Sequence, residues 1–229
     1  MTLMVSNIGY SPSQPVSNSW NGSLAKRLFD ISIATVALLL TLPITLLAAL
    51  VIKFTSSGPV FFRQIRLGKD GREFRLLKFR TMRHAPTADG PRVTRSGDPR
   101  VSKVGAVLRK WKIDELPQLL NVIQSEMSLV GPRPDVAEYL RTLNPAEKEI
   151  LRLSPGITGA ASLRYRNEEE LLSSVQPEDL QHYYCTKVLP DKVRIDLEYA
   201  RNAGLLSDLA ILVRSLIAIG GSGRNDRFI

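Results

Sequence analysis

The sequence predicts a mainly α-helical protein with a small β-hairpin, attached to a membrane by one apolar helix broken at Pro43. Three features predict this fold: an uncharged run over residues 31–52, two short apolar and basic stretches around a Lys-Asp-Gly turn at 69–71, and helix-start signals further on. The composition, 44% hydrophobic and 23% charged over 229 residues, is typical of a globular protein. One cysteine and two histidines disfavour a disulfide framework and a Cys/His metal cluster.

The net charge of +9 lies in one third of the chain. Residues 53–112 hold 16 Lys and Arg against four acids, a net of +12, so the remainder carries 15 minus 18, or −3. Such a concentration of positive charge indicates an anionic partner: nucleic acid, a membrane surface or a phosphorylated substrate.

The uncharged run over residues 31–52 is long enough, at about 33 Å as a straight helix, to cross a bilayer core. A cleaved signal peptide is disfavoured, because the run is long and begins some 30 residues into the chain. Pro43 interrupts the run, and basic residues flank both ends, Lys26 and Arg27 before it and Lys53 after it. These residues leave two arrangements open: a helix that bends at Pro43 and returns to the same face, or a kinked spanning helix.

The predicted elements follow in chain order. Residues 1–23 are rich in Ser, Asn, Pro and Gly and predict a flexible tail. Residues 60–66 and 73–82 predict the two strands of the hairpin, with Lys78 and Arg80 on one face of the second strand and Phe79 on the other. Residues 84–100 are expected to form a loop.

Several helices are predicted after that loop. One begins at Val101, and Asp114 is expected to be the N-cap of a second that runs to about Met127. Residues 131–134 (Gly-Pro-Arg-Pro) predict a rigid turn, residues 144–147 a capping box, and residues 154–159 a loop. A helix is expected from about residue 191 to 204, and the apolar segment 205–219 either packs in the core or lies at the membrane interface.

Asp114 and Glu115 are the candidate catalytic pair. For adjacent acids at a helix start, an N-cap is the commoner explanation, so the catalytic interpretation needs phosphate-binding groups nearby. Such groups are available, because Arg109 lies five residues upstream. The remaining candidates, which we expect to converge from the hairpin and the Pro-Arg-Pro turn, are Lys78, Arg80 and Arg133. A tight surface turn is the structural alternative for Arg133.

The basic hairpin also carries phenylalanines, which suggests a nucleic-acid platform as an alternative. The second strand lacks the glycines of an RNA-recognition motif, and no helix-turn-helix or zinc finger is present. Phenylalanines in the core and basic residues facing lipid headgroups therefore explain this segment better.

Several motifs in a fixed order resemble the bacterial sugar transferase family, the short monotopic phosphoglycosyl transferases that initiate exopolysaccharide, capsule and glycan assembly. They are KRLFD (26–30), an apolar segment with a central proline, KFRTM (78–82), GDPRVSKVGAVLRKWKIDELPQLLNVIQSEMSLVGPRPD (97–135) and SPGITG (154–159). The resemblance covers residues 24–219.

The resemblance implies transfer of a phospho-sugar from a UDP-sugar to polyprenyl (undecaprenyl) phosphate, with release of UMP and a requirement for Mg²⁺. It implies that Asp114 is the nucleophile and helps hold the metal, that Glu115 assists it, and that Arg109, Lys78 and Arg133 bind phosphate. The neighbouring cations are expected to keep Asp114 ionised. A membrane-anchored nucleic-acid binder and a non-catalytic scaffold are the rival classes, and the resemblance itself implies no nucleic-acid partner.

The resemblance also implies an organisation: a re-entrant membrane helix over residues 24–54, interfacial amphipathic helices, a cytoplasmic membrane-associated catalytic domain over 55–219 and a tail over 220–229. The protein would then lie on the cytoplasmic face of the bacterial inner membrane. Many members have Ser-Pro at the helix break, whereas this chain has Leu42-Pro43, with Thr41 as the nearest hydroxyl. The sequence identifies neither the sugar nor the pathway, and it leaves a homo-oligomer open.

Overall fold

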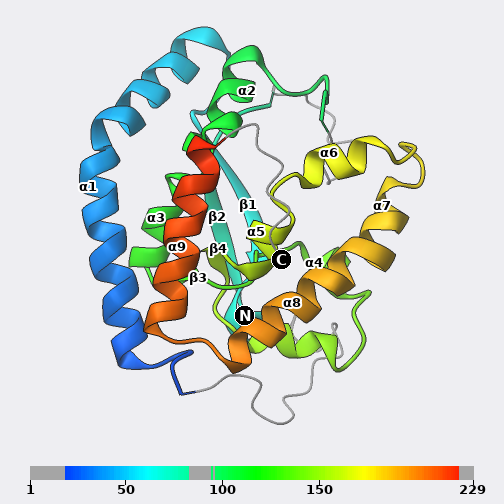
Figure 1. The fold of residues 1–229 in the computed structure, drawn as a ribbon. Helices are drawn as coiled ribbons and strands as arrows, with labels where there is room; N and C mark the ends of the chain where they lie inside the picture. The colour runs from blue at the N-terminus through cyan, green and yellow to red at the C-terminus, as the bar shows by residue number, and fades with distance from the viewer. Residues whose placement is uncertain (1–18, 83–93, 95, 222–229) are drawn as a thin grey trace.

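The computed structural model describes residues 19–82, 94 and 96–221, which form a mainly helical fold with two small sheets (Figure 1). The predicted fold class, mainly α with a β-hairpin, is confirmed. The predicted loop over residues 84–100 falls largely outside the described part of the chain, as do residues 1–18 and 222–229 of the two predicted tails. The principal elements, in chain order, are α1 (Leu24–Thr55), β1 (Phe61–Leu67), β2 (Glu73–Phe79), α2 (Lys103–Lys110), α3 (Gln118–Ile123), β3 (Ser128–Val130), α4 (Ala137–Leu140), β4 (Gly156–Thr158), α5 (Ala160–Arg164), α6 (Glu168–Ser173), α7 (Leu180–Tyr183), α8 (Leu189–Arg201) and α9 (Leu205–Gly220).

Helix α1 begins after Ser23, whose hydroxyl accepts a hydrogen bond from the Lys26 amide at 3.0 Å. The helix continues through Pro43 for 32 residues, so the predicted break at Pro43 is instead a position within one curved helix (Figure 1). The Thr41 hydroxyl donates to the Ala37 carbonyl at 2.7 Å rather than to the carbonyl of Leu39, which Pro43 leaves without its amide partner. A single proline removes only one backbone bond, which a long helix can tolerate.

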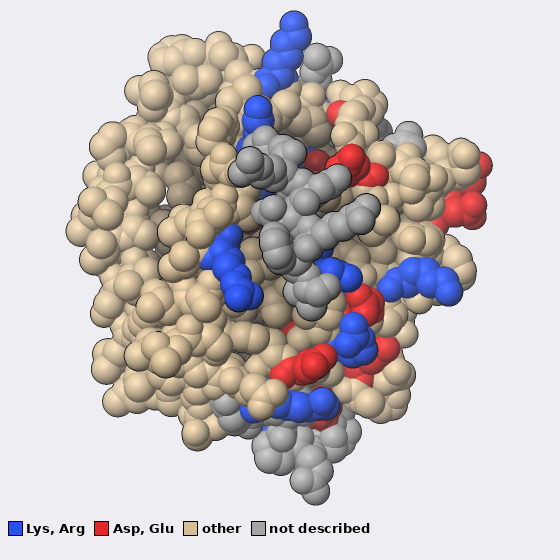
Figure 2. Space-filling model, viewed as in Figure 1, with Lys and Arg blue, Asp and Glu red and all other residues tan. Residues whose placement is uncertain are grey.

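Helix α1 is the candidate membrane segment of the chain. Within the described residues, α1 is the one helix whose length and composition would allow it to cross a membrane. Only 11% of its most apolar 18-residue window is buried, which distinguishes it from the core helix of a soluble protein. Figure 2 shows the side of the molecule formed by α1 without acidic or basic residues, while charged side chains gather elsewhere on the same face.

The hairpin forms as predicted. Strands β1 and β2 pair antiparallel, with Phe61 opposite Phe79 and Leu67 opposite Glu73. The connection runs through Asp70 and Gly71 in left-handed backbone conformations, at φ of 55° and 70°, which short polar residues and glycine adopt most easily. The ring of Phe79 is buried and stacks on Phe61, whereas Lys78 faces the opposite side.

A second sheet was not predicted. Strand β3 pairs parallel with β4, Ser128 opposite Gly156 and Val130 opposite Thr158, so residues 156–158 of the predicted loop form a strand. The backbones approach so closely that a Cβ on Gly156 would lie 2.2 Å from the Gly131 nitrogen. Glycine is therefore required there, and the pairing holds the Gly-Pro-Arg-Pro turn at the end of β3.

Two predicted helices differ from the observed ones. The helix expected from Asp114 to Met127 is shorter, because α3 spans only Gln118–Ile123. Ser125, at φ 68°, turns the chain after α3, and Met127 enters the core before β3. The apolar segment 205–219 forms α9, whose Ile211 and Leu212 pack in the core with residues of α1 and β3, while Leu205, Leu206, Leu209 and Leu216 stay exposed.

Buried polar contacts fasten the start of α1 to the rest of the fold. The Lys26 ammonium lies 2.7 Å from Asp30 and 2.8 Å from Asp208 of α9. Asp30 also accepts from the Ser128 hydroxyl at 2.8 Å, and Trp20 donates to Asp208 at 3.0 Å. Residues at the end of the predicted N-terminal tail thus belong to the fold, and α1, β3 and α9 share one buried ion cluster.

Candidate active site

Asp114 and Glu115 lie in a 3-10 turn, Ile113–Glu115, between α2 and α3. Lys112 has a left-handed conformation, at φ 54°, which redirects the chain after α2 and sets the pair at the start of the next helical segment. Asp114 is only 6% exposed, and the Glu115 side chain is 12% exposed. Two adjacent carboxylates are therefore held at the edge of the core rather than in free solvent.

Asp114 is not an N-cap, so that interpretation of the sequence is wrong. The residue at the N-cap position of α3 is Pro117, and no side chain caps the helix. Asp114 Oδ1 is buried and has no hydrogen-bond partner within the described chain. The turn positions the carboxylate, but the carboxylate contributes no hydrogen bond to the turn, and a structural reason for an aspartate here is therefore missing.

Glu115 joins two of the predicted phosphate-binding residues. Its Oε1 accepts from Lys78 Nζ of β2 at 2.7 Å and from Arg133 Nη2 of the Gly-Pro-Arg-Pro turn at 2.9 Å. Residues 37 and 18 positions away in sequence thus meet at one carboxylate oxygen. The predicted convergence of Lys78 and Arg133 on the acidic pair is observed.

The two carboxyl groups have opposite pKa shifts. Burial and the Glu115 charge raise the pKa of Asp114, and the cations Lys78, Arg109 and Lys112 only partly offset them. Burial also acts against ionisation of Glu115, but Arg133 and Lys78 outweigh it and hold the pKa of Glu115 well below its usual range. The neighbouring cations favour ionised Asp114, as expected, but burial and the Glu115 charge outweigh them, so the pKa of Asp114 is raised rather than lowered.

Arg109 lies near the pair but is engaged elsewhere. Its guanidinium donates to the Thr81 hydroxyl at 3.1 Å and to Glu169 of α6 at 3.0 Å. The Glu169 contact spans 60 positions and could not be predicted from local sequence. Because the Glu169 side chain is half exposed, a phosphate could replace it on Arg109 at little cost.

Arg80 is not brought to the acidic pair by any hydrogen bond. Its Nη2 donates to the Ser56 carbonyl at 3.0 Å and to the Ser56 hydroxyl at 2.7 Å. Ser56 is the C-cap of α1, so Arg80 fastens the end of the membrane helix to the hairpin. The predicted phosphate-binding role for Arg80 therefore has no support in this geometry.

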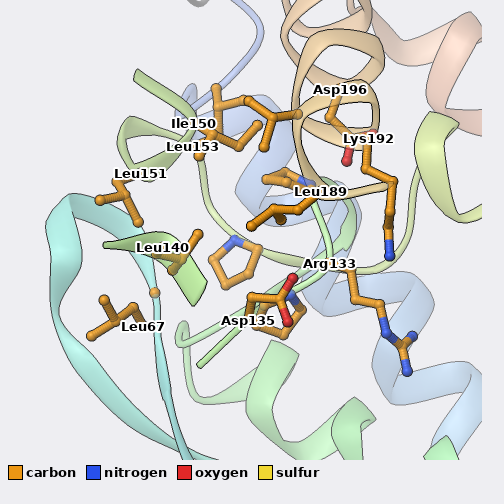
Figure 3. Close-up of a pocket in the computed structure, with 15 residues that line it drawn as sticks. Leu67, Arg133, Asp135, Leu140, Ile150, Leu151, Leu153, Leu189, Lys192 and Asp196 are labelled. Carbon is orange, nitrogen blue, oxygen red and sulfur yellow. The ribbon is translucent and has the colours of Figure 1, made fainter. Parts of the chain in front are cut away.

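A small cavity lies beside the Gly-Pro-Arg-Pro turn (Figure 3). Its volume of about 40 Å³ suits one or two water molecules but not a nucleotide, and neither Asp114 nor Glu115 lines it. Figure 3 shows the Arg133 guanidinium extending away from the leucines that form the opposite wall. Arg133 thus lines the cavity with the base of its side chain, while its guanidinium reaches Glu115.

The residues present are suited to Mg²⁺ held jointly with a phosphorylated substrate. Within the described residues, no group of three or more His, Cys, Asp or Glu side chains could hold a metal ion alone. Asp114 Oδ1 is nevertheless a buried oxygen acceptor to which no described residue donates a hydrogen bond. Mg²⁺ is commonly bound by one or two carboxylates together with substrate phosphates, and Asp114 supplies such a ligand.

Comparison with known proteins finds related sequences over most of the chain. The sequence profile of the bacterial sugar transferase family matches residues 21–221. The chain is 40% identical over 213 residues to the exopolysaccharide production protein ExoY of Rhizobium meliloti, covering 86% of each chain. It is 39% identical over 199 residues to the UDP-glucose:undecaprenyl-phosphate glucose-1-phosphate transferase of Caulobacter vibrioides, covering 84% of this chain and 68% of that protein.

A longer relative matches over a smaller share of its length. The UDP-glucose:undecaprenyl-phosphate glucose-1-phosphate transferase of Escherichia coli is 37% identical over 193 residues, which cover 82% of this chain and 39% of that protein. The range matched by the family profile includes the acidic pair and the residues gathered around it. The chain therefore belongs to the bacterial sugar transferase family, of the initiating phosphoglycosyl transferase type.

Proposed function

We propose that this protein transfers a phospho-sugar from a UDP-sugar to undecaprenyl phosphate, with release of UMP and through a covalent intermediate on Asp114. The relatives from Caulobacter vibrioides and Escherichia coli are UDP-glucose:undecaprenyl-phosphate glucose-1-phosphate transferases, which supports the general reaction. The observation that carries the proposal is Asp114 itself: a buried carboxylate without a hydrogen-bond partner among the described residues, beside a Glu115 that binds two cations.

In the first half-reaction, a carboxylate oxygen of Asp114 forms a bond to the β-phosphorus of the UDP-sugar. The bond from that phosphorus to the bridging oxygen breaks, and the bridging oxygen leaves as part of UMP. Lys78, Arg133 and Arg109 are the available cations for the diphosphate, whose charge would otherwise repel the attacking carboxylate. Bound Mg²⁺ would neutralise further phosphate charge and lower the pKa of Asp114.

In the second half-reaction, an oxygen of undecaprenyl phosphate attacks the phosphorus of the aspartyl phospho-sugar. The bond between phosphorus and the Asp114 oxygen breaks, which restores the carboxylate and gives the lipid-linked diphosphate sugar. Because UMP departs before the lipid reacts, the two substrates use the same carboxylate in turn. This order is ping-pong.

We also propose that α1 is re-entrant and that the catalytic domain lies at the cytoplasmic face. Both ends of α1 are fastened to one folded unit, the start through Lys26 and the end through the bond from Arg80 to Ser56. A helix that spanned the bilayer would place its ends about 30 Å apart on opposite faces. The exposed leucines of α9 would then face lipid at the interface.

This topology predicts that both ends of α1 are labelled from the same side of the membrane. We would place single cysteines at the exposed residues Ser19 and Ser57, in a Cys185→Ser background, with Ser174→Cys on the catalytic domain as reference. A membrane-impermeant maleimide should leave all three unlabelled in spheroplasts and label all three after lysis. Labelling of Ser19→Cys alone in spheroplasts would establish a spanning helix.

The pKa directions predict how activity varies with pH. An attacking Asp114 must be ionised, so the rate of UMP release should fall as pH drops through its raised pKa. Glu115→Gln removes a charge that raises this pKa, and the acid limb of the residual activity should move to lower pH.

Lys78→Met removes a cation that lowers the pKa of Asp114, so its acid limb should move to higher pH. Each shift should be about one pH unit. The measurement is the initial rate of UMP release across pH at saturating donor. Shifts of the same sign in both variants would contradict Asp114 as the titrating group.

The direct test of the proposed function is a screen for UMP release with purified protein, Mg²⁺, undecaprenyl phosphate and a panel of UDP-hexoses and UDP-N-acetylhexosamines. Release with at least one donor is expected. Salt-sensitive binding of DNA or RNA without UMP release would favour the nucleic-acid alternative instead. Absence of both activities would favour a scaffold.

A further inference from the structure

Gln118, the first residue of α3, is a buried amide that bonds nothing. Its exposed fraction is 2%, and its Nε2 is buried without a hydrogen-bond partner within the described chain. Burying an amide without a hydrogen bond costs on the order of 1–3 kcal/mol. In native proteins such a group usually has a purpose other than stability.

Comparison with the other buried polar residues sets Gln118 and Asp114 apart. Twelve polar or charged side chains are buried in the described part of the chain, and all but these two make a hydrogen bond there. Asn121, one turn further along α3, shows the usual behaviour: its amide donates to the Arg75 carbonyl and to Glu126, and accepts from the Leu77 amide. The fold can evidently satisfy a buried amide on this helix.

These two residues are neighbours along the backbone, whereas other unpaired buried atoms of the described chain, such as Arg80 Nη1 and Ser162 Oγ, lie elsewhere in the sequence. Leu116 and Pro117 have right-handed helical conformations, so the chain from Asp114 to Gln118 completes about one helical turn. Side chains four residues apart on such a turn lie roughly 6 Å apart at Cβ. One group is a hydrogen-bond donor and the other an acceptor, yet they do not bond each other.

We propose that Gln118 is a further catalytic residue, whose side-chain amide donates a hydrogen bond to a non-bridging oxygen of the β-phosphate that Asp114 attacks. The inference rests on the proposed function. A phosphoryl group between them would satisfy both: its oxygen accepts from Gln118 Nε2, and its phosphorus accepts the new bond from the Asp114 oxygen. No proton moves at Gln118, while the bond to UMP breaks as already described.

A neutral donor has a specific advantage at this position. A further cation beside Asp114 would stabilise the carboxylate and weaken it as a nucleophile, whereas an amide binds the phosphoryl oxygen without forming an ion pair with the attacking group. The hydrogen bond strengthens as negative charge accumulates on that oxygen, which favours the transition state over the bound donor.

The test is Gln118→Met, which keeps the length and approximate volume of the side chain but removes the donor. We expect an unchanged or higher melting temperature, because an unsatisfied buried amide is lost. We also expect a first-turnover rate of UMP release about 100-fold lower, the usual effect of removing one preorganised donor. The matched control is Gln124→Met, the same substitution at the exposed C-terminal end of α3, which should match wild type in both measurements.

The outcomes separate this inference from the proposed function. Wild-type release of UMP tests the function, and the ratio of Gln118→Met to wild type tests Gln118. A wild-type rate in Gln118→Met, or a lower melting temperature with an unchanged rate, would overturn the catalytic role. If Gln118→Met does not fold, Gln118→Asn withdraws the amide by one methylene, and the same loss of rate is expected. Wild-type protein inactive with every donor would overturn both proposals.

Discussion

Asp114→Asn is expected to eliminate UMP release while leaving the protein folded. Asparagine has nearly the same shape but no negative charge, so it cannot form the bond to phosphorus, and a loss of about 10⁴-fold or more is expected. Because the Asp114 side chain makes no hydrogen bond in the described chain and burial raises its pKa, its charge does not stabilise the fold. The melting temperature should therefore be unchanged or higher.

The matched control is Asp70→Asn in the hairpin turn. Asp70 is exposed, and its left-handed backbone conformation is one that asparagine adopts readily, so wild-type activity and stability are expected. The measurements are first-turnover UMP release and thermal unfolding of the purified protein. An active Asp114→Asn variant would remove Asp114 from the chemistry altogether.

Lys26→Met is expected to cause the largest loss of stability. Lys26 is the one basic side chain with which Asp30 and Asp208 form ion pairs within the described chain, and all three side chains are at most 7% exposed. Removal of the ammonium leaves two buried carboxylates without a counter-charge, which costs about 3–5 kcal/mol. For a protein of this size the melting temperature should fall by about 10 °C.

Two comparisons isolate the ion cluster. Lys53→Met, at the exposed far end of α1, should leave the melting temperature unchanged. Adding Asp208→Asn to Lys26→Met removes one of the stranded charges and should recover part of the loss. Thermal unfolding in detergent micelles measures both, and a melting temperature for Lys26→Met equal to that of wild type would contradict a buried ionic anchor for α1.

The parts of the fold that were predictable depend on short-range patterns. The hairpin turn at residues 69–71, the Ser102 cap of α2 and the reciprocal capping box between Asn144 and Glu147 all involve residues within a few positions of one another. The backbone chemistry of such neighbours decides the structure locally. These elements were therefore accessible from the sequence.

The parts that were missed depend on distant partners. Strand β4 exists because β3 lies beside it; with only three residues, the first of them glycine, the Gly-Ile-Thr segment is too short for a strand pattern to be recognised. Asp114 has the pattern of an N-cap, but the left-handed turn at Lys112 places it inside a 3-10 turn, and Pro117 takes the N-cap position of α3. Arg80 shares a strand face with Lys78, yet Ser56 is the partner that the fold supplies.

The candidate site likewise combines residues that the sequence identifies with properties that only the structure reveals. The family resemblance supplied the identities of Asp114, Glu115, Lys78 and Arg133, and the structure shows that one oxygen of Glu115 joins the last two. The direction of the Asp114 pKa shift could not be predicted. The sequence shows several cations near Asp114, which lower its pKa, but it does not show the burial that raises the pKa by more. No sequence pattern pointed to Gln118. It stands out only because its side-chain amide is buried without a hydrogen-bond partner in the described chain, which the sequence cannot show.

The most direct test of the central claim, that Asp114 carries the phospho-sugar, is intact-mass spectrometry of the protein incubated with UDP-sugar and Mg²⁺ in the absence of lipid. Wild type should gain the mass of one phospho-sugar and release one UMP per protein molecule, Asp114→Asn should gain none, and added undecaprenyl phosphate should remove the adduct. An unmodified wild-type protein that releases UMP only when lipid is present would mean direct transfer between the two substrates, and would contradict the account.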